Sequence, residues 1–248
     1  MTATTFLPDL YSGKVALVVG GTSGIGAAIA DAFAGLGAVV TVSGASREEC
    51  DAARASPRFR CRDAVALDVR DDAAVTALIA SLPRLDALVN CAGIIRRGAE
   101  HDVVVFAEVL AINLTGTMRC CALAREKLKA AGGAIVNTAS VLSFLGGGLV
   151  PGYSASKGGV AQLTKSLAIA YAPDGIRVNA IAPGWVTTPL TQALQADPQR
   201  SAAILARTPL ARWAAPEDIA GAAVFLCSPA ARFVTGVVLP VDGGYLIS

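Results

Sequence analysis

The sequence predicts a doubly wound α/β fold: a single domain of about seven parallel strands with helices on both faces of the sheet. Three observations predict it. Short apolar runs alternate with helical stretches along the whole chain, and most of these runs are continuously apolar, as parallel strands buried on both faces should be. Gly is abundant at 25 residues while aromatic residues make up only 5%, which suits helices packed closely on a sheet. A length of 248 residues suits one such domain, and no repeat or linker divides residues 1–248.

The predicted strands are KVALVV at 14–19, VVTVS at 39–43, AVALD at 64–68, ALVN at 87–90, AIVNTA at 134–139, RVNAIA at 177–182 and VVLPVD at 237–242. Helices are expected near 25–35, 72–81, 103–129, 156–171 and 216–227. The segment 186–212 interrupts the alternation, because Thr-Pro and Pro-Leu breakers separate its helical patches. It follows a strand end, where a loop that covers a substrate would lie.

The distribution of charge and hydrophobicity argues against nucleic-acid and membrane partners. The net charge is +2, from 21 basic and 19 acidic residues scattered along the chain, with no basic block. No run of eighteen unbroken apolar residues occurs, and residues 1–14 have neither the basic nor the apolar region of a signal peptide. A cytoplasmic protein is therefore expected.

Cysteine and histidine usage narrows the chemistry further. His101 is the single histidine, so a Ser-His-Asp triad or a multi-histidine metal site is hard to assemble, and no metal site is predicted. The cysteines form no CxxC pair and have no zinc-ligand spacing, so buried reduced thiols are expected. These cysteines are Cys50, Cys61, Cys91, Cys120, Cys121 and Cys227.

A glycine-rich turn joins the first predicted strand to the first helix. Its three glycines allow a tight turn, close approach of the backbone to a pyrophosphate, and packing of the helix against the strand. The helix N-terminus attracts phosphates. The turn therefore predicts a dinucleotide site of the Rossmann type, and its residues are Gly20, Thr22, Ser23, Gly24, Ile25 and Gly26.

Two further strand ends should reach the same crevice. Asp68, followed by Val69, closes the third predicted strand and is placed to meet an adenine edge. Asn90 closes the fourth strand and is followed by Ala92 and Gly93. The alternative is that Asp68 and Asn90 only shape turns through side-chain hydrogen bonds to the backbone.

Ser140, Tyr153 and Lys157 form the candidate catalytic group. Tyr153 and Lys157 are four residues apart, and the residues that follow read as helix, so their side chains share one face. Ser140 ends a predicted strand and reaches the same place across a glycine-rich connection. An adjacent ammonium would bring the pKa of the phenol from near 10 toward the working range, so Tyr153 would be the acid and base. Ser140 would hydrogen-bond the substrate oxygen. Standing alone, YxxxK would favour an incidental Tyr and Lys on a surface helix.

Together these motifs resemble the classical short-chain dehydrogenase/reductase family over essentially the whole chain. The motifs that occur in the family's order are GxxxGIG at 20–26, NxAG at 90–93, Ser140, YxxxK at 153–157 and PGxxxT at 183–188. The resemblance implies hydride transfer between a nicotinamide cofactor and a carbinol or carbonyl carbon. It implies that Tyr153 moves the proton, that Ser140 positions the substrate oxygen, and that Lys157 lowers the tyrosine pKa and holds the nicotinamide ribose.

The resemblance also implies roles for residues beside these motifs. Asn113 matches the asparagine that supports a water relay to the lysine. Val186 and Thr188 match the positions that hold the carboxamide, in a cofactor-binding segment that begins at Pro183 and Gly184. Departures from the family pattern, which bear on packing more than on catalysis, are Val19 in place of threonine and Cys91 in place of asparagine.

The end of the second strand should determine the choice between NAD and NADP. NAD binders usually carry an acidic residue there, which would repel a 2′-phosphate, and residues 43–47 contain none. Ser43, Ser46 and Arg47 could accept the phosphate instead. The arginine that many NADP-dependent relatives place at Ala45 is missing. We expect NAD(P)(H), with NADP(H) favoured; the alternative for Arg47 is a solvated start to a helix.

Three stretches resemble the ketodeoxygluconate and gluconate dehydrogenase branch of the family: residues 94–97, 143–153 and 191–213. Arg96 and Arg97 follow the fourth strand, where they would bind a substrate carboxylate or stay as solvated charges. The resemblance implies a sugar acid substrate, although the segment that follows Arg97 is shorter than in that branch. A 3-oxoacyl or small-ketone reductase is the alternative. A catalytically silent nucleotide-binding member is opposed by the intact tyrosine and lysine.

The apolar content of some predicted helices exceeds what the surface of a monomer should show. The helices at 103–129 and 156–171 carry apolar residues on more than one face, and the tail ends in Tyr245, Leu246 and Ile247. The resemblance implies that such helices and tails meet their counterparts in a closed homotetramer, with a dimer as the alternative. A monomer would have to pack both helix faces within one chain.

Overall fold

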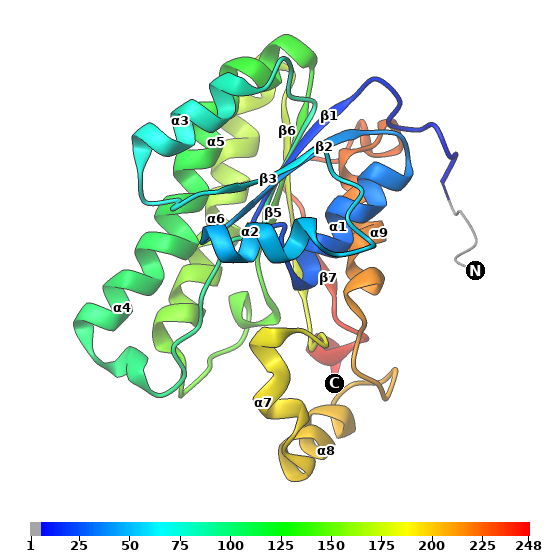
Figure 1. Ribbon diagram of the computed structural model, residues 1–248. Helices are drawn as coiled ribbons and strands as arrows, with labels where there is room; N and C mark the ends of the chain where they lie inside the picture. The colour runs from blue at the N-terminus through cyan, green and yellow to red at the C-terminus, as the bar shows by residue number, and fades with distance from the viewer. Residues whose placement is uncertain (1–5) are drawn as a thin grey trace.

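The computed structural model describes residues 6–248 and has a parallel sheet between two layers of helices (Figure 1). Its strands are β1 (Val15–Val19), β2 (Val39–Gly44), β3 (Asp63–Ala66), β4 (Ala87–Asn90), β5 (Ala134–Thr138), β6 (Arg177–Pro183) and β7 (Val238–Val241). The seven strands lie in the order β3-β2-β1-β4-β5-β6-β7, so the predicted doubly wound fold is confirmed. The sequence argument against a signal peptide concerns residues 1–14, of which residues 1–5 lie outside the described part of the chain.

Strand β1 lies near the middle of the sheet and pairs in parallel with β2 on one side and with β4 on the other. The helices that follow β1 and β4 lie on opposite faces of the sheet, which opens a crevice at the carboxyl ends of these two strands. All five residues of β1 are buried, as a central parallel strand requires.

Alternate residues of β1 serve the two faces of the sheet. Ala16 and Val18 point to the layer of α1 (Gly24–Gly35) and α9 (Pro216–Cys227), where they join Phe33 in one core. Leu17 and Val19 belong to the core on the other face, which is covered by α3 (Asp72–Ser81), α5 (Gly116–Ala131) and α6 (Pro151–Tyr171). Helix α4 (Val103–Leu110) packs beside α6, farther from the sheet (Figure 1).

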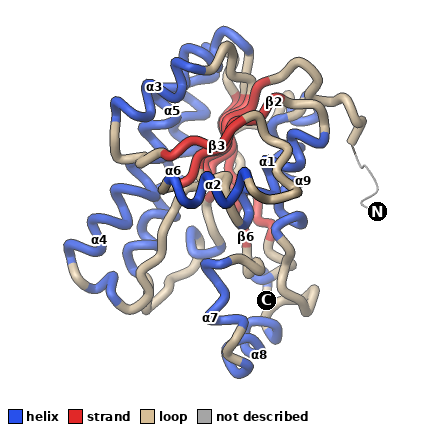
Figure 2. The backbone as a smooth tube through the Cα atoms, in the orientation of Figure 1, coloured by secondary structure: helices blue, strands red, loops and turns tan. Residues whose placement is uncertain are grey.

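Three helical regions differ from the prediction, whereas the helical patches expected in 186–212 are present (Figure 2). Helix α6 begins at Pro151, five residues before the expected start, because proline is well suited to the first helical position. The stretch expected as one helix is α4 and α5 joined by a π-helical turn at Ala111–Thr115. Helix α2 (Arg47–Arg54) was not among the expected helices, but its start at Arg47 agrees with the alternative given for that residue. The segment 186–212 contains α7 (Gln192–Gln195) and α8 (Pro198–Ala206), which lie below the carboxyl ends of the strands in Figure 1.

The stretch Val103–Ala131, which combines α4, the π turn and α5, is long and apolar enough to cross a membrane by length and composition alone. Its most apolar window has a mean hydropathy of 1.5, and 28% of that window is buried in the fold. Several α5 residues pack in the core against the sheet: Cys120, Cys121, Ala124 and Leu128. A helix of the core of a globular protein meets the same criterion, so this feature carries no membrane assignment.

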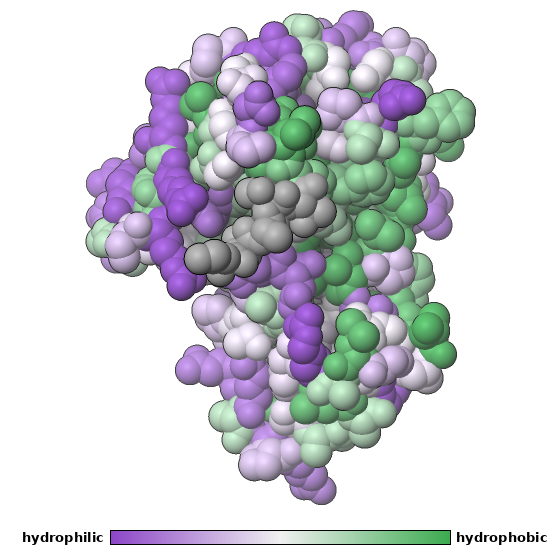
Figure 3. Space-filling view, turned by 90° about the vertical axis from the view of Figure 1, so that its right-hand side faces the viewer, coloured by the Kyte–Doolittle hydropathy of each residue, from purple (hydrophilic) through white to green (hydrophobic). Residues whose placement is uncertain are grey.

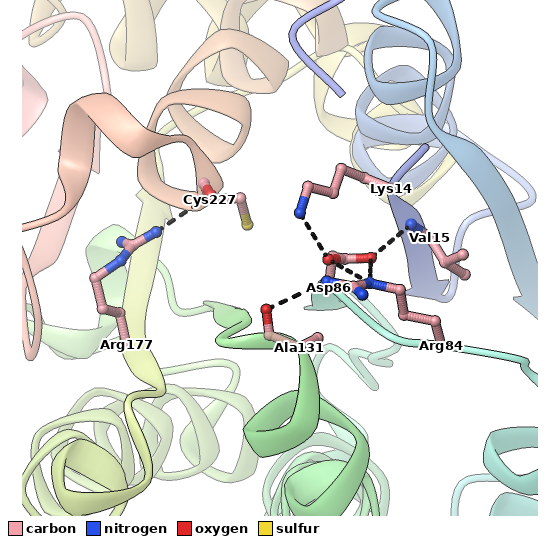
Figure 4. Close-up of polar contacts among 7 residues, drawn as sticks. All are labelled: Lys14, Val15, Arg84, Asp86, Ala131, Arg177 and Cys227. Atoms are coloured by element: carbon pink, nitrogen blue, oxygen red, sulfur yellow. Dashed lines mark hydrogen bonds and ion pairs between the residues drawn. The ribbon is translucent and has the colours of Figure 1, made fainter. Parts of the chain in front are cut away.

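A polar cluster fastens the amino ends of the strands, opposite the crevice (Figure 4). Asp86, just before β4, accepts hydrogen bonds from the Val15 amide at 3.0 Å, the Lys14 ammonium at 3.1 Å and the Arg84 guanidinium at 2.8 Å. Its side chain is only 8% exposed. Burial opposes ionisation of Asp86, but the hydrogen bonds from Arg84, Val15 and Lys14 outweigh it and hold the pKa of Asp86 below its usual value.

We predict that Asp86→Asn lowers the free energy of unfolding at pH 7 by about 1–3 kcal/mol, since a buried carboxylate with charged donors is replaced by a neutral amide. Because the folded-state pKa is depressed, this stabilisation is fully present above the ordinary Asp value near 3.9 and is lost as pH falls through the lower folded-state pKa. Urea unfolding at pH 7 and below pH 4 should therefore show a difference that shrinks with acidity. Asp51→Asn, which alters an exposed ion pair with Arg54, is the control and should show a smaller effect at both pH values. An equal loss in both variants would contradict the role of Asp86.

Candidate active site

The crevice at the carboxyl ends of the strands is a cleft of about 500 Å³. Residues from the turn after β1 and from the ends of β2 through β6 line it. Most of the predicted cofactor residues are among them: Gly20, Thr22, Ser23, Gly24, Ile25, Gly26, Ser43, Asp68, Val69, Ala92, Gly93, Tyr153, Lys157, Pro183, Gly184, Val186 and Thr188. The cleft thus brings together residues that are far apart in the sequence.

The glycine-rich turn has no room for a side chain at Gly20 or Gly26. A Cβ at Gly26 would lie 2.1 Å from the carbonyl oxygen of Gly20, and one at Gly20 would lie 2.5 Å from the Ala92 nitrogen. Gly20 also has φ of +77°, a left-handed conformation that favours glycine. Ser23 stands at the N-cap of α1 without making a side-chain cap, so the first amides of the helix are left to a ligand in the cleft. This backbone cradle at a helix N-terminus fits the pyrophosphate of a dinucleotide.

Asn90 does not line the cleft, contrary to the expectation from its strand-end position. Its amide nitrogen donates to Asn137 Oδ1 at 2.9 Å and to Cys121 Sγ at 3.3 Å in the core. Its Oδ1 is buried and has no partner among the described residues. The side chain of a strand's last residue points to one face of the sheet, and here that is the α5 and α6 face, away from the cleft.

Tyr153 and Lys157 lie one turn apart in α6, both facing the cleft, with Lys157 Nζ 5.5 Å from the centroid of the Tyr153 ring. Lys157 is buried, at 4% exposure, and its ammonium donates to the carbonyl of Thr138 at 2.7 Å. Burial lowers the pKa of Lys157 to about 8, and the neighbouring Cys91 thiol acts weakly in the other direction. Burial therefore makes the Lys157 ammonium easier to deprotonate than that of an exposed lysine.

Ser140 lies beside Tyr153, as predicted. Its Oγ accepts the Leu142 amide at 3.1 Å, which caps the short helical turn Val141–Ser143 and fixes the side chain. Burial raises the pKa of Tyr153, and a hydrogen bond with Ser140 lowers it in part. The sequence predicted a pKa lowered by Lys157; in the structure burial dominates because the phenol lies in the interior of the cleft wall. The phenol is thus a proton donor at neutral pH.

Asn113 lies in the π turn and is fully buried, behind the wall of the cleft and not on its surface. Its side chain exchanges two hydrogen bonds with the backbone of Ile94, at 2.8 and 2.9 Å, and donates to Ser156 Oγ at 3.1 Å. Ser156 in turn donates to the carbonyl of Tyr153 at 2.7 Å. Asn113 thereby ties the loop after β4 to the catalytic helix.

Ser46 and Arg47, which were expected to accept a phosphate, do not line the cleft. Ser46 Oγ accepts the Glu49 amide at 3.2 Å and so caps α2, and Arg47 borders a separate surface hollow. The structure instead brings Glu49 into the cleft, where its Oε2 accepts the Ala45 amide at 2.8 Å. The spacing S-x-x-E of a helix start could have revealed this, since Glu at the third helical position commonly turns back toward the cap.

Asp68 lines the cleft, but it is paired with a residue that sequence reasoning missed. Arg70 makes three side-chain hydrogen bonds to the Asp68 carboxylate, the shortest at 2.7 Å, and also lines the cleft. The hydrogen bond from Arg70 is the main cause that lowers the pKa of Asp68. The end of β3 therefore offers a guanidinium as well as a carboxylate.

The two arginines after β4 have different locations. Arg97 lines the cleft, whereas Arg96 lies outside it, with its Nε 4.0 Å from Glu108. Arg97 shares the cleft with several apolar side chains: Ile94, Ile95, Val141, Leu142, Trp185 and Leu190. A guanidinium in a cleft with apolar walls suits a substrate that carries an anionic group on a carbon skeleton.

All six cysteines are free thiols; Cys50, Cys120 and Cys121 are buried and the other three are partly buried. Cys91 lines the cleft, and Thr138 Oγ1 donates to its sulfur at 3.3 Å. Burial raises the pKa of the Cys91 thiol. Within residues 6–248, no group of three or more His, Cys, Asp or Glu side chains is placed to hold a metal ion.

Comparison with known proteins places the chain among dehydrogenases. The family model described as enoyl-(acyl carrier protein) reductase matches residues 19–246. The cis-4-hydroxycyclohexanecarboxylate dehydrogenase of Sinomonas cyclohexanicum is 44% identical, over 96% of this chain and 98% of that protein. The 2-dehydro-3-deoxy-D-gluconate 5-dehydrogenase of Bacillus subtilis is 43% identical, over 97% and 98% of the two chains.

A solved structure supports the same grouping. A protein of Beutenbergia cavernae, provisionally assigned as an NAD(P)-dependent gluconate 5-dehydrogenase and containing NADP at low occupancy, superposes with a TM-score of 0.89. It is 43% identical, and the match covers 98% of this chain and 100% of that one. The family match, these identities and the Ser140, Tyr153 and Lys157 group agree with the resemblance seen in the sequence. The chain belongs to the short-chain dehydrogenase/reductase family.

Proposed function

We propose that the protein is an NAD(P)(H)-dependent oxidoreductase that interconverts a secondary alcohol and a carbonyl on a carboxylate-bearing substrate, such as a sugar acid. The observation that carries this proposal is the convergence of Tyr153, Lys157 and Ser140 on the cleft that also contains the glycine cradle. The bound nicotinamide would supply or accept the hydride.

The residues of this chain have separate parts in the reaction. In the reductive direction, the Tyr153 phenol gives its proton to the carbonyl oxygen, while Ser140 donates a hydrogen bond that holds this oxygen. Lys157, fixed by the Thr138 carbonyl, places its positive charge beside the phenol and stabilises the phenolate left behind. In the oxidative direction the same atoms act in reverse.

The cradle and the strand ends would hold the cofactor. Gly20, Gly24 and Gly26 with the free N-terminus of α1 suit the pyrophosphate. All four of Asp68, Val69, Val186 and Thr188 line the cleft; Asp68 and Val69 would contact the adenine, and Val186 and Thr188 would hold the carboxamide, as the family resemblance implies. The NADP found in the Beutenbergia cavernae protein supports NADP(H) as the cofactor here.

Arg97 supports a carboxylate substrate. It is the arginine after β4 that reaches the cleft, and a guanidinium binds a carboxylate through two parallel hydrogen bonds. The named substrates of the Sinomonas and Bacillus relatives both carry a carboxylate, one on an apolar ring and one on a polyhydroxy chain. The apolar lining of this cleft also leaves a 3-oxoacyl or small-ketone reductase as the second candidate, and the description of the family model names a reductase of an acyl carrier protein substrate.

The experiment is an assay of NADPH oxidation with a carbonyl panel that contains 5-dehydro-D-gluconate, an acetoacetyl thioester, and the matched pair 4-oxocyclohexanecarboxylate and cyclohexanone. We expect kcat/KM to be at least about tenfold higher for the ring that carries the carboxylate, since a charge-assisted hydrogen bond contributes about 1.5–3 kcal/mol. Arg97→Met should abolish this ratio. A preference for the thioester, or equal rates for the two rings, would favour the second candidate.

The same assay tests the catalytic group. Tyr153→Phe removes only the ionisable oxygen, so the fold and NADPH binding should persist while turnover falls at least about a hundredfold. Circular dichroism and NADPH titration check that the variant is otherwise intact. Near wild-type turnover would remove Tyr153 from its proposed role, and absence of turnover in the wild type with the whole panel would favour a silent nucleotide-binding protein.

The position of Glu49 generates a prediction about cofactor preference. Its carboxylate lies beside Ala45 at the end of β2, where a 2′-phosphate would be repelled. Because Glu49 is exposed and screened by solvent, Glu49→Gln should raise the ratio of NADPH to NADH affinity only about fivefold. Isothermal titration calorimetry with both cofactors measures the ratio. Glu48→Gln removes the neighbouring charge outside the cleft and should leave the ratio unchanged; equal effects of the two variants would place the 2′-phosphate elsewhere.

We propose further that the protein is a cytoplasmic homotetramer. Val103, Val104 and Ile169 are 78–79% exposed on α4 and α6, and Leu123 on α5 is 37% exposed. On the α1 and α9 side, hydrophobic residues gather toward the right-hand edge of the view (Figure 3), and β7 is an edge strand. Both surfaces suit contacts between copies of the chain.

Light scattering after size exclusion at micromolar concentration tests this assembly. A closed homotetramer has four times the 25.1 kDa mass of one chain. Val104→Glu should lower the measured mass by placing a charge in the contact, whereas Leu7→Glu, at an exposed residue far from α4, should not. A wild-type mass near 25.1 kDa would refute the tetramer, and recovery in the membrane fraction of lysed cells would refute the cytoplasmic location.

A further inference from the structure

Among the Asp and Glu residues of the described chain, Glu100 is the one that is buried, with 1% of its surface exposed. It lies in the turn Ala99–His101, between the loop that follows β4 and α4. Its Oε2 accepts the backbone amide of Tyr153, and its Oε1 accepts the backbone amide of Arg96, both at 2.7 Å. No Lys or Arg side chain within residues 6–248 forms an ion pair with it. A buried charge without a cation requires another source of stabilisation.

The start of helix α6 provides that stabilisation. The N-cap position is occupied by Val150, whose side chain cannot accept a hydrogen bond, and the Tyr153 amide is one of the donors that the helix leaves free. Glu100 accepts this donor from a distant part of the chain and places its negative charge at the positive end of the helix dipole. The catalytic tyrosine thus belongs to the turn of α6 that Glu100 caps.

The second oxygen of Glu100 holds the opposite wall of the cleft. The loop after β4 carries Arg97, and its backbone is fixed through the adjacent Arg96 amide. Two parallel contacts join the same segments: the Gly98 amide donates to the Leu149 carbonyl at 2.8 Å, and His101 Nε2 lies 2.9 Å from the Gly148 carbonyl. One carboxylate therefore links the wall that would bind the substrate to the helix that carries the acid.

We propose that Glu100 is a positioning residue for the reaction: it holds the start of α6, with Tyr153, at a fixed place relative to the loop that carries Arg97. This role rests on the proposed function of Tyr153 as the proton donor. Substrate carboxylate and substrate carbonyl have to be placed at the same time, and a displacement of about 1 Å between their binding groups costs about a hundredfold in rate.

The charge of Glu100 also affects the phenol itself. The charged groups in contact with Tyr153 are Lys157 on the same helix and Glu100. Cys91 acts on Lys157, and Arg97 lines the same cleft. Burial raises the pKa of Tyr153, Ser140 opposes this through a hydrogen bond, and the carboxylate of Glu100 raises the pKa further. A neutral residue at this position should therefore shift the titration of Tyr153 to lower pH, which a purely structural role would not do.

The test is an NMR titration of protein labelled with 13Cζ tyrosine, with the Tyr153 signal assigned by its loss in Tyr153→Phe. Glu100→Gln keeps the size of the side chain and removes the charge, so we expect the Tyr153 signal to begin its change at lower pH than in the wild type. Glu108→Gln is the matched control, because it removes a charge from nearby α4 without contacting Tyr153. Equal titrations in the two variants would overturn the proposal. This readout needs no substrate and stands even if the proposed reaction is wrong.

Glu100→Asp separates charge from position, and it keeps the proposal testable if Glu100→Gln fails to fold by circular dichroism. Aspartate retains the charge but is one methylene shorter, so it cannot reach the Tyr153 and Arg96 amides together. The Tyr153 titration should stay near that of the wild type, while turnover of the best panel substrate falls at least about tenfold with NADPH affinity within twofold. Wild-type turnover in Glu100→Asp would overturn the positioning role. Wild-type turnover in Tyr153→Phe would instead overturn the proposed function.

Discussion

The whole cleft depends on how closely the backbone packs where β1 turns into α1. Gly20 lies against Ala92 beyond β4, and Gly26 lies against Gly20, at distances that exclude even a methyl group. This packing sets the N-terminus of α1 over the gap between β1 and β4, where the connections of the sheet diverge to opposite faces. A bulkier residue at Gly20 or Gly26 would push the helix away from the strand, and the residues after β4, β5 and β6 would then line a different space.

Much of this arrangement could be predicted because its signals are local. Continuous apolar runs defined the seven strands, and the glycine spacing defined the turn. The four-residue spacing of Tyr153 and Lys157 placed both side chains on one helix face, as found. These features depend on backbone geometry and on the side-chain periodicity of helices and strands, both of which can be recognised in short stretches of sequence.

The features that could not be predicted depend on contacts between distant segments. Asn90 has the position of a cleft residue, but its pairing with Asn137 across the sheet turns it into the core. Arg96 and Arg97 are adjacent and chemically alike, and only the folded loop decides that Arg97 reaches the cleft. The pKa of Tyr153 was expected to follow its lysine neighbour, whereas the depth of burial, which no local pattern reveals, determines the direction. Glu100 looks like a solvated loop acid in the sequence, and its role requires the start of α6 to be in place.

The carboxyl terminus has a consequence for how the cleft can open. The tail is joined to the segment 186–212: Arg207 at the end of α8 donates to the Tyr245 hydroxyl at 3.2 Å, and the Leu210 amide donates to the Gly243 carbonyl at 3.1 Å. Tyr245 also packs edge to face against Trp185, in the wall of the cleft. A movement of α7 and α8 on their own would therefore strain these contacts. Any outward movement must carry the last residues of the chain with it or break these contacts. A fusion partner joined directly after Ser248 would therefore hinder the movement of α7 and α8.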